Sequence, residues 1–567
     1  MQGKRNKIAI NIIVSFTITL LFFGYIITRY TFNLASDDAQ MRAIASGALT
    51  GKPDAHLVYM KYILGKVMVL LYDLFPEYNC YGIFFICMFM VVMTIYLFWL
   101  LRRKQIFAVV IVLGISVICI LPMMLELNFT YSATIVGSLA LFLIICEENK
   151  TIWKNTGISL LLWLCFCIRD SVFCVILSFV CLHEFYQIWL ESSSIKEIIP
   201  KYLKKYMICI ILVLVTIIIE NVAYASDEWN LYNHYNGHRS AIVDYSDWPS
   251  YETHQKLYKD NGIDEYTYEL LDYSRLTIPN VNMYKLVENV DDVLQQEKSN
   301  ISFKTKFVTT CYTMYNDMFS RDYSITNFII SFLLGISLIY CCEKDSEKYM
   351  YLKIVFAFSG YLFMWFYLTY IGRPLKRVIL SIQLVLMIFL LAEIYNTKRT
   401  VMKTNALFLI KMIIVLVGGF MVVNSLNLAN DQSVAIAKMN YDIHQISDYC
   451  KQHSDNVYFV KSSTYAFEQE NNWKNKSISC NVIYPGGWIT NSPLFYEQLA
   501  ANKISNPFDE LAYKEKAFFI SDNHEIPDII KNYYNSFNNE CAYVVTDQID
   551  NGQMLYDKMF IYKFLCK

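Results

Sequence analysis

The chain has 567 residues, of which 55% are hydrophobic and 16% aromatic, and its formal net charge is −1. Charged residues make up 17% of the sequence, against roughly 25% in soluble domains, so much of the chain is expected to lie in lipid. The nearly neutral charge provides no field that would attract nucleic acid, and no DNA- or RNA-binding motif is visible. Most of the 16 cysteines fall inside apolar runs, where we expect them to act as small hydrophobic residues and not as metal ligands or a disulfide framework.

The first apolar segment runs from Ile8 to Ile27 and follows Lys4, Arg5 and Lys7. A run of about 20 residues is long enough to cross a bilayer. Because no small-x-small cleavage site follows it, we interpret this segment as an uncleaved membrane anchor and not as a signal peptide.

Apolar segments of spanning length recur along most of the chain. They cover residues 8–28, 81–101, 106–124, 131–146, 157–168, 171–190, 207–223, 326–342, 349–369, 375–396 and 405–424. Basic residues gather in alternate loops, at 4–7, 102–104, 150–154, 196–205, 344–348 and 398–403. The positive-inside rule then predicts about eleven spans in the cell membrane, with a cytoplasmic N-terminus and an extracytoplasmic C-terminus.

Three longer segments are expected on the outer side of the membrane, at 29–80, 224–325 and 428–567. In the first, a short helix near 39–48 precedes an apolar run at 59–75 that is expected to lie along the interface as an amphipathic helix. The charged residues gather near one surface, and the middle of the membrane is predicted to be almost free of charge.

The last segment has the pattern of a small α/β domain. Strands are predicted at Val457–Val460, Ala517–Ile520, Ala542–Val545 and Phe560–Phe564, and helices near 433–451 and 526–537. We therefore predict an α-helical polytopic membrane domain, 1–425, followed by a small extracytoplasmic α/β domain, 426–567.

Two adjacent acids, Asp37 and Asp38, follow the first span. A carboxylate at the membrane surface can act as general base for an acceptor hydroxyl, and its neighbour can bind a divalent cation. The alternative is structural, because Ser36 is a natural N-cap and acids in the first turn complement the helix dipole. Glu126, in the next outer turn, is a candidate to complete a metal site with Asp38.

Two further charged groups are expected at the same membrane surface. Arg169 and Asp170 interrupt an apolar stretch, where charges indicate function. Arg373, Lys376 and Arg377 open a span against its helix dipole, which a phosphate ligand would explain. The alternatives are that Arg169 and Asp170 pair with each other and that the second cluster anchors the chain to anionic lipid.

The large outer loop adds weaker candidates. Arg239 and Asp244 either bind substrate or pair with each other. His234 and His238 have metal-ligand spacing only on a helix, and Asn236–Gly237 between them predicts a turn. We therefore expect no metal at these histidines.

Together these features resemble the GT-C class of integral-membrane glycosyltransferases: an acidic pair after the first span, a long outer loop with amphipathic helices, a second acid in the next outer turn, about eleven spans and a C-terminal outer domain. The residues around Asp37–Asp38, Gly51–Lys52–Pro53 and Gly372–Arg373–Pro374 are also similar to uncharacterised multi-pass proteins of Gram-positive anaerobes.

The resemblance implies a polyprenyl-phosphate sugar as donor and a glycan or wall-polymer hydroxyl as acceptor. It implies that Asp37 or Asp38 is the catalytic base, in some members with a divalent cation such as Mg or Mn. The basic residues Arg169, Arg373 and Arg377 would bind the donor phosphate.

Two other function classes stay open. A transporter or flippase for a lipid-linked or anionic substrate often has inverted repeats and helices broken near the midplane, and neither is visible here. A non-catalytic scaffold for envelope assembly is compatible with the large outer loop and the terminal domain.

Overall fold

The computed structural model describes residues 2–34, 36–147, 151–191, 195–274, 278, 281–342, 350–396, 404–460, 473–474, 480–522, 524–537, 540–549 and 558–567. Within these residues, nine helices are long and apolar enough to cross a membrane, and two shorter apolar helices cover Ile152–Ile168 and Ser324–Leu338. The protein is therefore a polytopic helical membrane protein. The number of crossings and the orientation of the termini stay predictions.

In the described residues, each of the eleven segments that the sequence predicts as spans falls on helices of the apolar bundle; residue 349, the first of the segment 349–369, lies outside the described residues. The helices of the bundle are α1 (Gln2–Arg29), α4 (Cys80–Arg102), α5 (Ile106–Ile115), the π-helix η1 (Ser116–Ile120), α6 (Leu121–Leu125), α7 (Phe129–Cys146), α8 (Ile152–Ile168), α9 (Asp170–Glu191), α10 (Ile195–Ala223), α16 (Ser324–Cys342), α17 (Met350–Tyr370), α18 (Lys376–Asn396) and α19 (Thr404–Gln452). This agreement has a physical cause, because a chain in hydrocarbon must satisfy its backbone polar groups internally, and a helix does so within one segment.

Helix α7 forms the centre of the bundle and contacts α4, α8, α9 and α18. Almost all of its side chains are buried. Gly137 permits this packing: a Cβ atom there would lie 2.6 Å from Cγ1 of Ile176 and 2.9 Å from Sγ of Cys165. The neighbouring helices α8 and α9 therefore approach α7 closely at this glycine.

Replacing Gly137 by Val is expected to destabilise the bundle by about 1–3 kcal/mol through overpacking. The matched control is Gly157→Val on α8, where an added Cβ meets no atom within 4 Å. Both variants introduce the same β-branched residue into a helix, so comparing their melting temperatures in detergent isolates the packing contribution. Equal losses in the two variants would contradict the close approach at Gly137.

Residues 29–80 form the first loop segment, which packs at one end of the bundle. It contains α2 (Ser36–Ser46) and α3 (Tyr62–Leu74), and the short strand β1 (Asn33–Leu34) pairs in parallel with β2 (Glu126–Leu127). The pairing of Asn33 with Glu126 attaches this segment to the turn before α7.

Residues 224–325 form the second loop segment, which is helical. It contains α11 (Asp227–Val243), α12 (Gln255–Asp260), α13 (Glu265–Ser274), α14 (Met283–Asn300) and α15 (Phe303–Met318). The turn predicted at Asn236–Gly237 is wrong, because α11 continues through both residues.

The helix persists for two reasons. Its start is strongly favoured, since Ser226 accepts a hydrogen bond from the backbone N–H of Trp229 and two acids follow in the first turn. One face of α11, which includes Trp229, Tyr232 and Ile242, is buried. This packing outweighs the cost of one internal glycine, which is about 1 kcal/mol.

The C-terminal segment is a small α/β unit beyond α19. Its strands are β3 (Val457–Val460), β4 (Val482–Ile483), β5 (Ala517–Ser521), β6 (Cys541–Ile549) and β7 (Met559–Cys566). Its helices are α21 (Pro493–Ala501), α22 (Pro507–Tyr513) and α23 (Glu525–Ser536). The strands form one sheet in the order β4-β3-β5-β7-β6. β3 is parallel to β4 and β5, whereas β7 is antiparallel to β5 and β6. A disulfide joins Cys541 to Cys566 across β6 and β7. The four strands predicted from the sequence all fall on strands.

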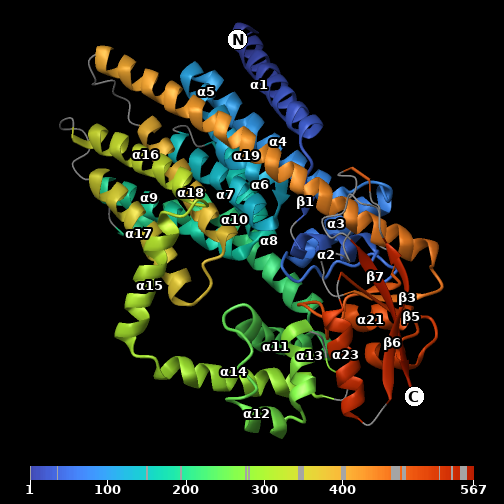
Figure 1. The fold of residues 1–567 in the computed structure, drawn as a ribbon. Coiled ribbons are helices and arrows are strands. Elements are labelled where there is room, and N and C mark those ends of the chain that lie inside the picture. The colour runs from blue at the N-terminus through green and yellow to red at the C-terminus, as the bar shows by residue number, and fades with distance from the viewer. Residues whose placement is uncertain are drawn as a thin grey trace.

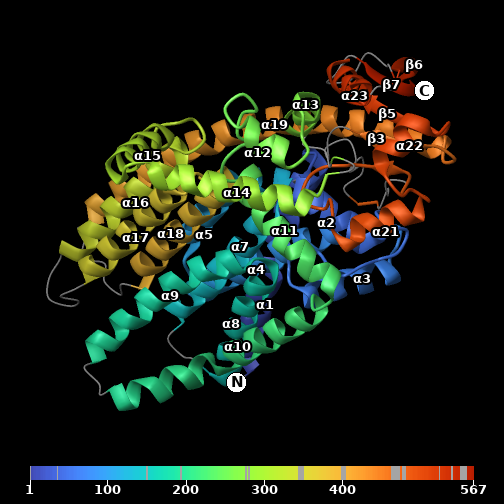
Figure 2. The same cartoon turned by 90° about the horizontal axis from the view of Figure 1, so that it is seen from below.

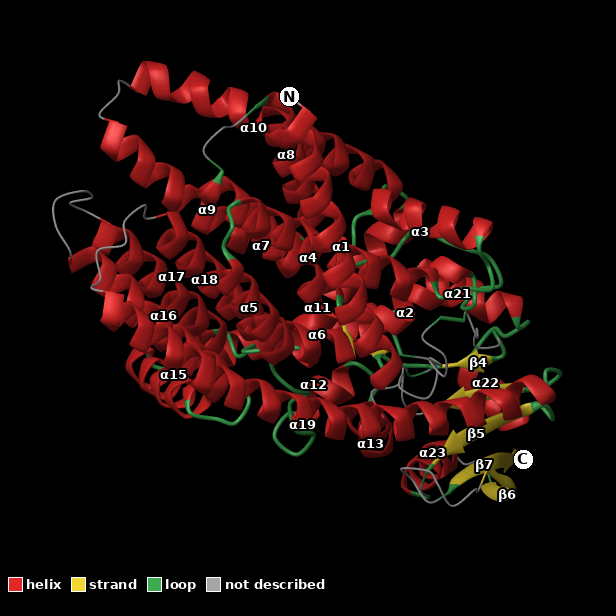
Figure 3. Cartoon of the chain, turned by 90° about the horizontal axis from the view of Figure 1, so that it is seen from above, coloured by secondary structure: helices red, strands yellow, loops and turns green. Residues whose placement is uncertain are grey.

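Helix α19 connects the bundle to this sheet. It appears in Figure 1 as one long orange helix that crosses the bundle toward the red strands, and the boundary predicted between residues 425 and 426 falls inside it. The five-stranded sheet lies at one end of a mostly helical molecule (Figure 3). Figure 2 shows that α11–α14 and the sheet lie on the side away from the N-terminus, so the loop segments and the C-terminal unit gather at one end of the bundle.

Candidate functional site

A cavity of about 290 Å³ lies where the bundle, both loop segments and the C-terminal unit meet. Its charged wall residues are Asp37, Arg169, Arg239, Asp244, Arg373 and Arg377. Four guanidinium groups thus face two carboxylates. This excess of positive charge in a partly enclosed space favours an anionic ligand.

The two carboxylates are each held by arginine. Asp37 lies 3.0 Å from the guanidinium of Arg377. Asp244 lies 3.3 Å from Arg373 and 3.6 Å from Arg239. Arg239 therefore pairs with Asp244, which is one of the two alternatives that the sequence leaves open, the other being substrate binding. Both residues also line the cavity.

Arg169 lies in the break between α8 and α9, where it caps α8 in extended conformation. Its guanidinium lies over the rings of Tyr59 and Phe129, 5.7 Å and 5.0 Å from their centroids, and its Nε donates to Ser171. Burial lowers the pKa of Arg169 from its ordinary value, although a guanidinium stays protonated in proteins. No described acid lies within ion-pair distance of Arg169, since Asp170 pairs instead with Lys61 at 3.0 Å.

The turn between α17 and α18 delivers Arg373 to the cavity. Gly372 has a φ of +83°, a conformation that residues with a Cβ rarely adopt, and an added Cβ would lie 3.3 Å from the carbonyl oxygen of Tyr245. The guanidinium of Arg373 lies over the ring of Tyr245. Lys376, predicted to bind substrate, does not line the cavity and pairs with Asp322 at 2.6 Å.

The adjacent acids Asp37 and Asp38 occupy different environments. Asp37 lines the cavity, whereas Asp38 is fully buried. Oδ1 of Asp38 accepts hydrogen bonds from the Tyr81 hydroxyl at 2.7 Å and the Phe129 N–H at 2.9 Å. Burial raises the pKa of Asp38 well above its ordinary value. Asp38 thus fastens α2 to α4 and α7, and Asp37 is the member of the pair that can meet a ligand.

The structure does not bring Asp38 and Glu126 into a cluster of metal ligands. Glu126 is exposed, accepts a hydrogen bond from Gln432 and does not line the cavity. Among the described residues, the one group of three or more side chains with metal-ligand proximity is His234, His238 and Glu288. The sequence prediction discounted these histidines because it placed a turn where α11 is helical.

The C-terminal unit supplies a cavity wall that the sequence prediction did not identify. Its loop after β4 contributes Tyr484, Gly486, Gly487, Trp488 and Thr490. Trp488 lies against Tyr59 of the first loop segment, with ring centroids 4.9 Å apart, and its carbonyl accepts a hydrogen bond from the Tyr232 hydroxyl at 2.7 Å. The signal available in the sequence was a proline–glycine–glycine turn flanked by Tyr484 and Trp488, which is typical of an exposed recognition loop.

Two residues of the cavity wall each have a buried polar atom without a partner. Nε1 of Trp248 and Oγ1 of Thr490 are buried, and neither has a hydrogen-bond partner among the described residues. Both side chains line the cavity. Buried donors normally find partners, so these two atoms are exceptions among the wall residues, and because both are buried they do not themselves face the cavity.

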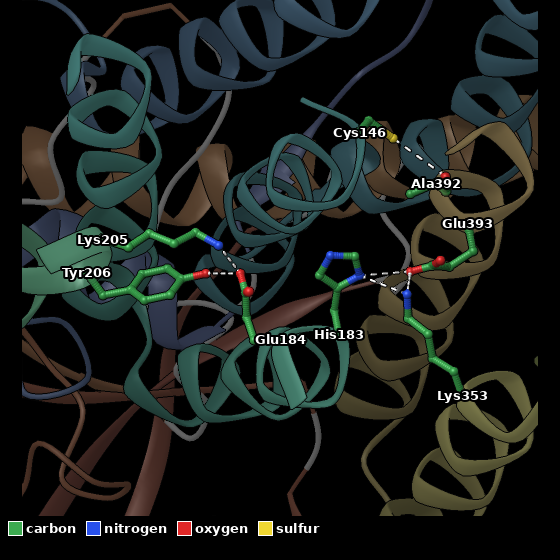
Figure 4. Close-up of polar contacts among 8 residues, drawn as sticks. All are labelled: Cys146, His183, Glu184, Lys205, Tyr206, Lys353, Ala392 and Glu393. Carbon is green, nitrogen blue, oxygen red and sulfur yellow. Dashed lines mark hydrogen bonds and ion pairs between the residues drawn. The ribbon is translucent and has the colours of Figure 1, made fainter. Parts of the chain in front are cut away.

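A second polar cluster lies inside the bundle (Figure 4). His183 Nδ1 lies 3.0 Å from a carboxylate oxygen of Glu393 and 2.9 Å from Nζ of Lys353, which also pairs with Glu393. All three side chains are buried. Lys353 and Glu393 lie near the ends of α17 and α18 that are opposite the Arg373 turn. The sequence prediction missed this cluster when it placed the charges near one surface.

A neighbouring group extends the polar interior. Glu184 follows His183 on α9, pairs with Lys205 and accepts a hydrogen bond from the Tyr206 hydroxyl at 2.6 Å (Figure 4). The two groups together place three basic and two acidic residues between α9, α10, α17 and α18.

No family model, no curated protein and no solved structure matches the chain.

Proposed function

We propose that the protein is a membrane glycosyltransferase of the GT-C type, which transfers a sugar from a polyprenyl-phosphate donor to an acceptor hydroxyl outside the cytoplasm, in cell-envelope glycan synthesis. The observation that carries the proposal is the cavity at the end of the apolar bundle, where Asp37 lies among four arginines. The proposal includes about eleven membrane spans, with the cavity on the outer side.

The arginines suit the phosphate of a lipid-linked donor. Arg169 lies at the junction of α8 and α9, and Arg373 and Arg377 lie at the start of α18. If these arginines hold the phosphate, the attached polyprenyl chain extends alongside the apolar helices of the bundle. Arginine binds phosphate in bidentate fashion, and each charge-assisted hydrogen bond is stronger than a neutral one.

The rest of the wall suits a sugar. Tyr59, Trp248 and Trp488 offer aromatic faces, and Thr490 and the backbone at Gly486 and Gly487 add polar groups to the wall. Apolar walls with a few placed polar groups are typical of small-molecule sites.

In the proposed reaction, the Asp37 carboxylate accepts the proton of the acceptor hydroxyl as that oxygen bonds to the anomeric carbon. The bond from the anomeric carbon to the phosphate oxygen breaks, and its electron pair leaves with the polyprenyl phosphate. The arginines stabilise the negative charge that develops on this phosphate. The reaction needs no oxidant or further co-reactant.

The cavity residues do not fit a divalent cation well. Both carboxylates are already paired with arginines, and Asp38 and Glu126 lie elsewhere. We therefore derive no step through Mg or Mn, and a requirement for either stays a sequence-based prediction.

The test is transfer by the full chain in proteoliposomes supplied with polyprenyl-phosphate sugars and a panel of glycan acceptors. Sugar transfer that depends on the protein supports the proposal. Lipid-linked sugar that crosses the bilayer without transfer overturns it in favour of a flippase.

Replacing Arg169 by Gln is expected to raise the KM for the donor roughly 10- to 100-fold, because one charge-assisted contact to the phosphate is lost. Arg169 is the suitable position because no described carboxylate lies within ion-pair distance of it, and Asp170 keeps its pair with Lys61 when Arg169 is replaced. The matched control is Lys376→Gln, which removes a positive charge from an exposed pair outside the cavity. Equal KM values for both variants would remove Arg169 from the donor site.

The buried cluster favours transport as a second candidate function. Ionisable residues inside a membrane bundle commonly mark proton or ion pathways, and His183, Lys353 and Glu393 form such a group. The proteoliposome assay described above separates this candidate from the enzyme.

A further inference from the structure

Two histidines and a glutamate lie close together on a solvent-exposed part of the second loop segment. His234 and His238 lie one turn apart on α11, and Glu288 lies on α14, which packs against α11. One ligand atom from each side chain lies within 4.8 Å of the others. The two imidazole centroids are 4.7 Å apart.

A buried carboxylate orients one of these histidines. Nδ1 of His238 lies 2.7 Å from Oδ2 of Asp291, and Asp291 is 4% exposed. Gln295 donates to the other Asp291 oxygen at 3.2 Å and so holds the carboxylate. Because Nδ1 is the donor to Asp291, the lone pair of His238 is on Nε2, on the far side of the ring. Metal-binding histidines are commonly held in this way by an acid.

We propose that His234, His238 and Glu288 bind a divalent transition metal, with zinc the best match. Two imidazoles and a carboxylate are a ligand set that zinc accepts, with water in the fourth position. Zinc bonds of about 2.0 Å require ligand atoms about 3.3 Å apart. His234 and Glu288 are exposed and can rotate, so the three groups reach that spacing by small side-chain movements.

The site would hold the cavity wall in place. Tyr235 and Arg239 of α11 and Met283 of α14 line the cavity, so a metal that joins α11 to α14 fixes two helices of that wall. This consequence rests on the proposed function, whereas metal binding itself does not.

The test uses the full chain, purified in detergent with a tag that contains no histidine, stripped with a chelator and then titrated with Zn²⁺ or Co²⁺. The expected results are one bound metal per chain, visible Co²⁺ absorption bands of a tetrahedral site and a higher melting temperature, because binding to the folded state stabilises it. The double variant His234→Ala/Glu288→Gln is expected to lose at least 100-fold in metal affinity.

The matched control is His254→Ala. His254 lies in the same loop segment and pairs with Glu297 of α14, outside the cluster, so its loss leaves metal binding unchanged. Wild-type protein that binds no metal, or a double variant that binds it normally, overturns the proposal. Because these measurements need no substrate, failure of the metal site and failure of the glycosyltransferase proposal are distinguishable; metal binding without sugar transfer would overturn the enzyme alone.

Discussion

Replacing Asp37 by Asn is expected to lower the rate of sugar transfer by about 10²–10⁴-fold, whereas Asp38→Asn is expected to leave transfer close to wild type. General-base catalysis contributes an acceleration of this size, and an amide cannot accept the proton. Asp37 lines the cavity. Asp38 is buried against Tyr81 and Phe129, and an Asn carbonyl there can accept both of these hydrogen bonds.

The two variants are matched controls for each other, since they make the same change at neighbouring positions of one helix. Transfer lost in Asp38→Asn and kept in Asp37→Asn would reverse the assignment. Transfer kept in both would leave the two acids with structural roles alone. A third variant, Asp38→Ala, removes both hydrogen bonds and is expected to destabilise the fold by about 1–3 kcal/mol.

The pH dependence of stability provides an independent check on Asp38. Burial raises its pKa above the ordinary 3.8, so the folded chain keeps this proton at pH values where the unfolded chain releases it. The stabilisation from this proton is therefore fully present below about pH 3.8 and is lost as pH rises toward the folded pKa. Asn carries no such proton. Thermal unfolding is expected to show Asp38→Asn gaining stability relative to wild type as pH rises above 4, and a constant difference would contradict the burial.

The helices of the bundle can be predicted from the sequence, but the contacts of Asp37 and Asp38 cannot. Apolar length alone predicts where α4 or α18 lies, because lipid leaves few alternatives to a helix. The choice between Asp37 and Asp38 depends on Tyr81 and Phe129, which are 43 and 91 residues from Asp38. Successive helical residues point about 100° apart, so the two neighbours must differ, but no local pattern indicates which one faces the cavity.

Two other features of the structure differ from the sequence-based predictions, and both result from packing between residues far apart in the chain. Asn236–Gly237 carries a turn signal, yet buried Tyr232 and Ile242 on either side keep α11 helical. Trp488 is held at the cavity by its ring contact with Tyr59 and by the hydrogen bond from Tyr232 to its carbonyl. No local sequence pattern around Trp488 predicts either contact. The first difference creates the histidine pair, which lies outside the cavity. The second adds a wall from the C-terminal unit to the candidate site.

The buried cluster of His183, Lys353 and Glu393 leads to the second prediction, a large loss of stability. Replacing Lys353 by Met is expected to destabilise the protein by about 3–5 kcal/mol, because it leaves the Glu393 carboxylate buried without its ammonium partner. The matched control on the neighbouring helix is Lys376→Met, which breaks an exposed pair with Asp322 and is expected to cost less than about 1 kcal/mol. The measurement is the melting temperature of the solubilised protein.

The double variant Lys353→Met/Glu393→Gln tests what the cluster is for. Removing both charges is expected to restore most of the stability lost in Lys353→Met, because neither side chain then needs an ionic partner, and the double-mutant cycle measures their coupling. If the cluster is structural, the stable double variant keeps its sugar transfer. If it carries protons or ions for transport, the double variant folds but no longer transports. A double variant as unstable as Lys353→Met would contradict an uncompensated Glu393 charge as the cause of the lost stability.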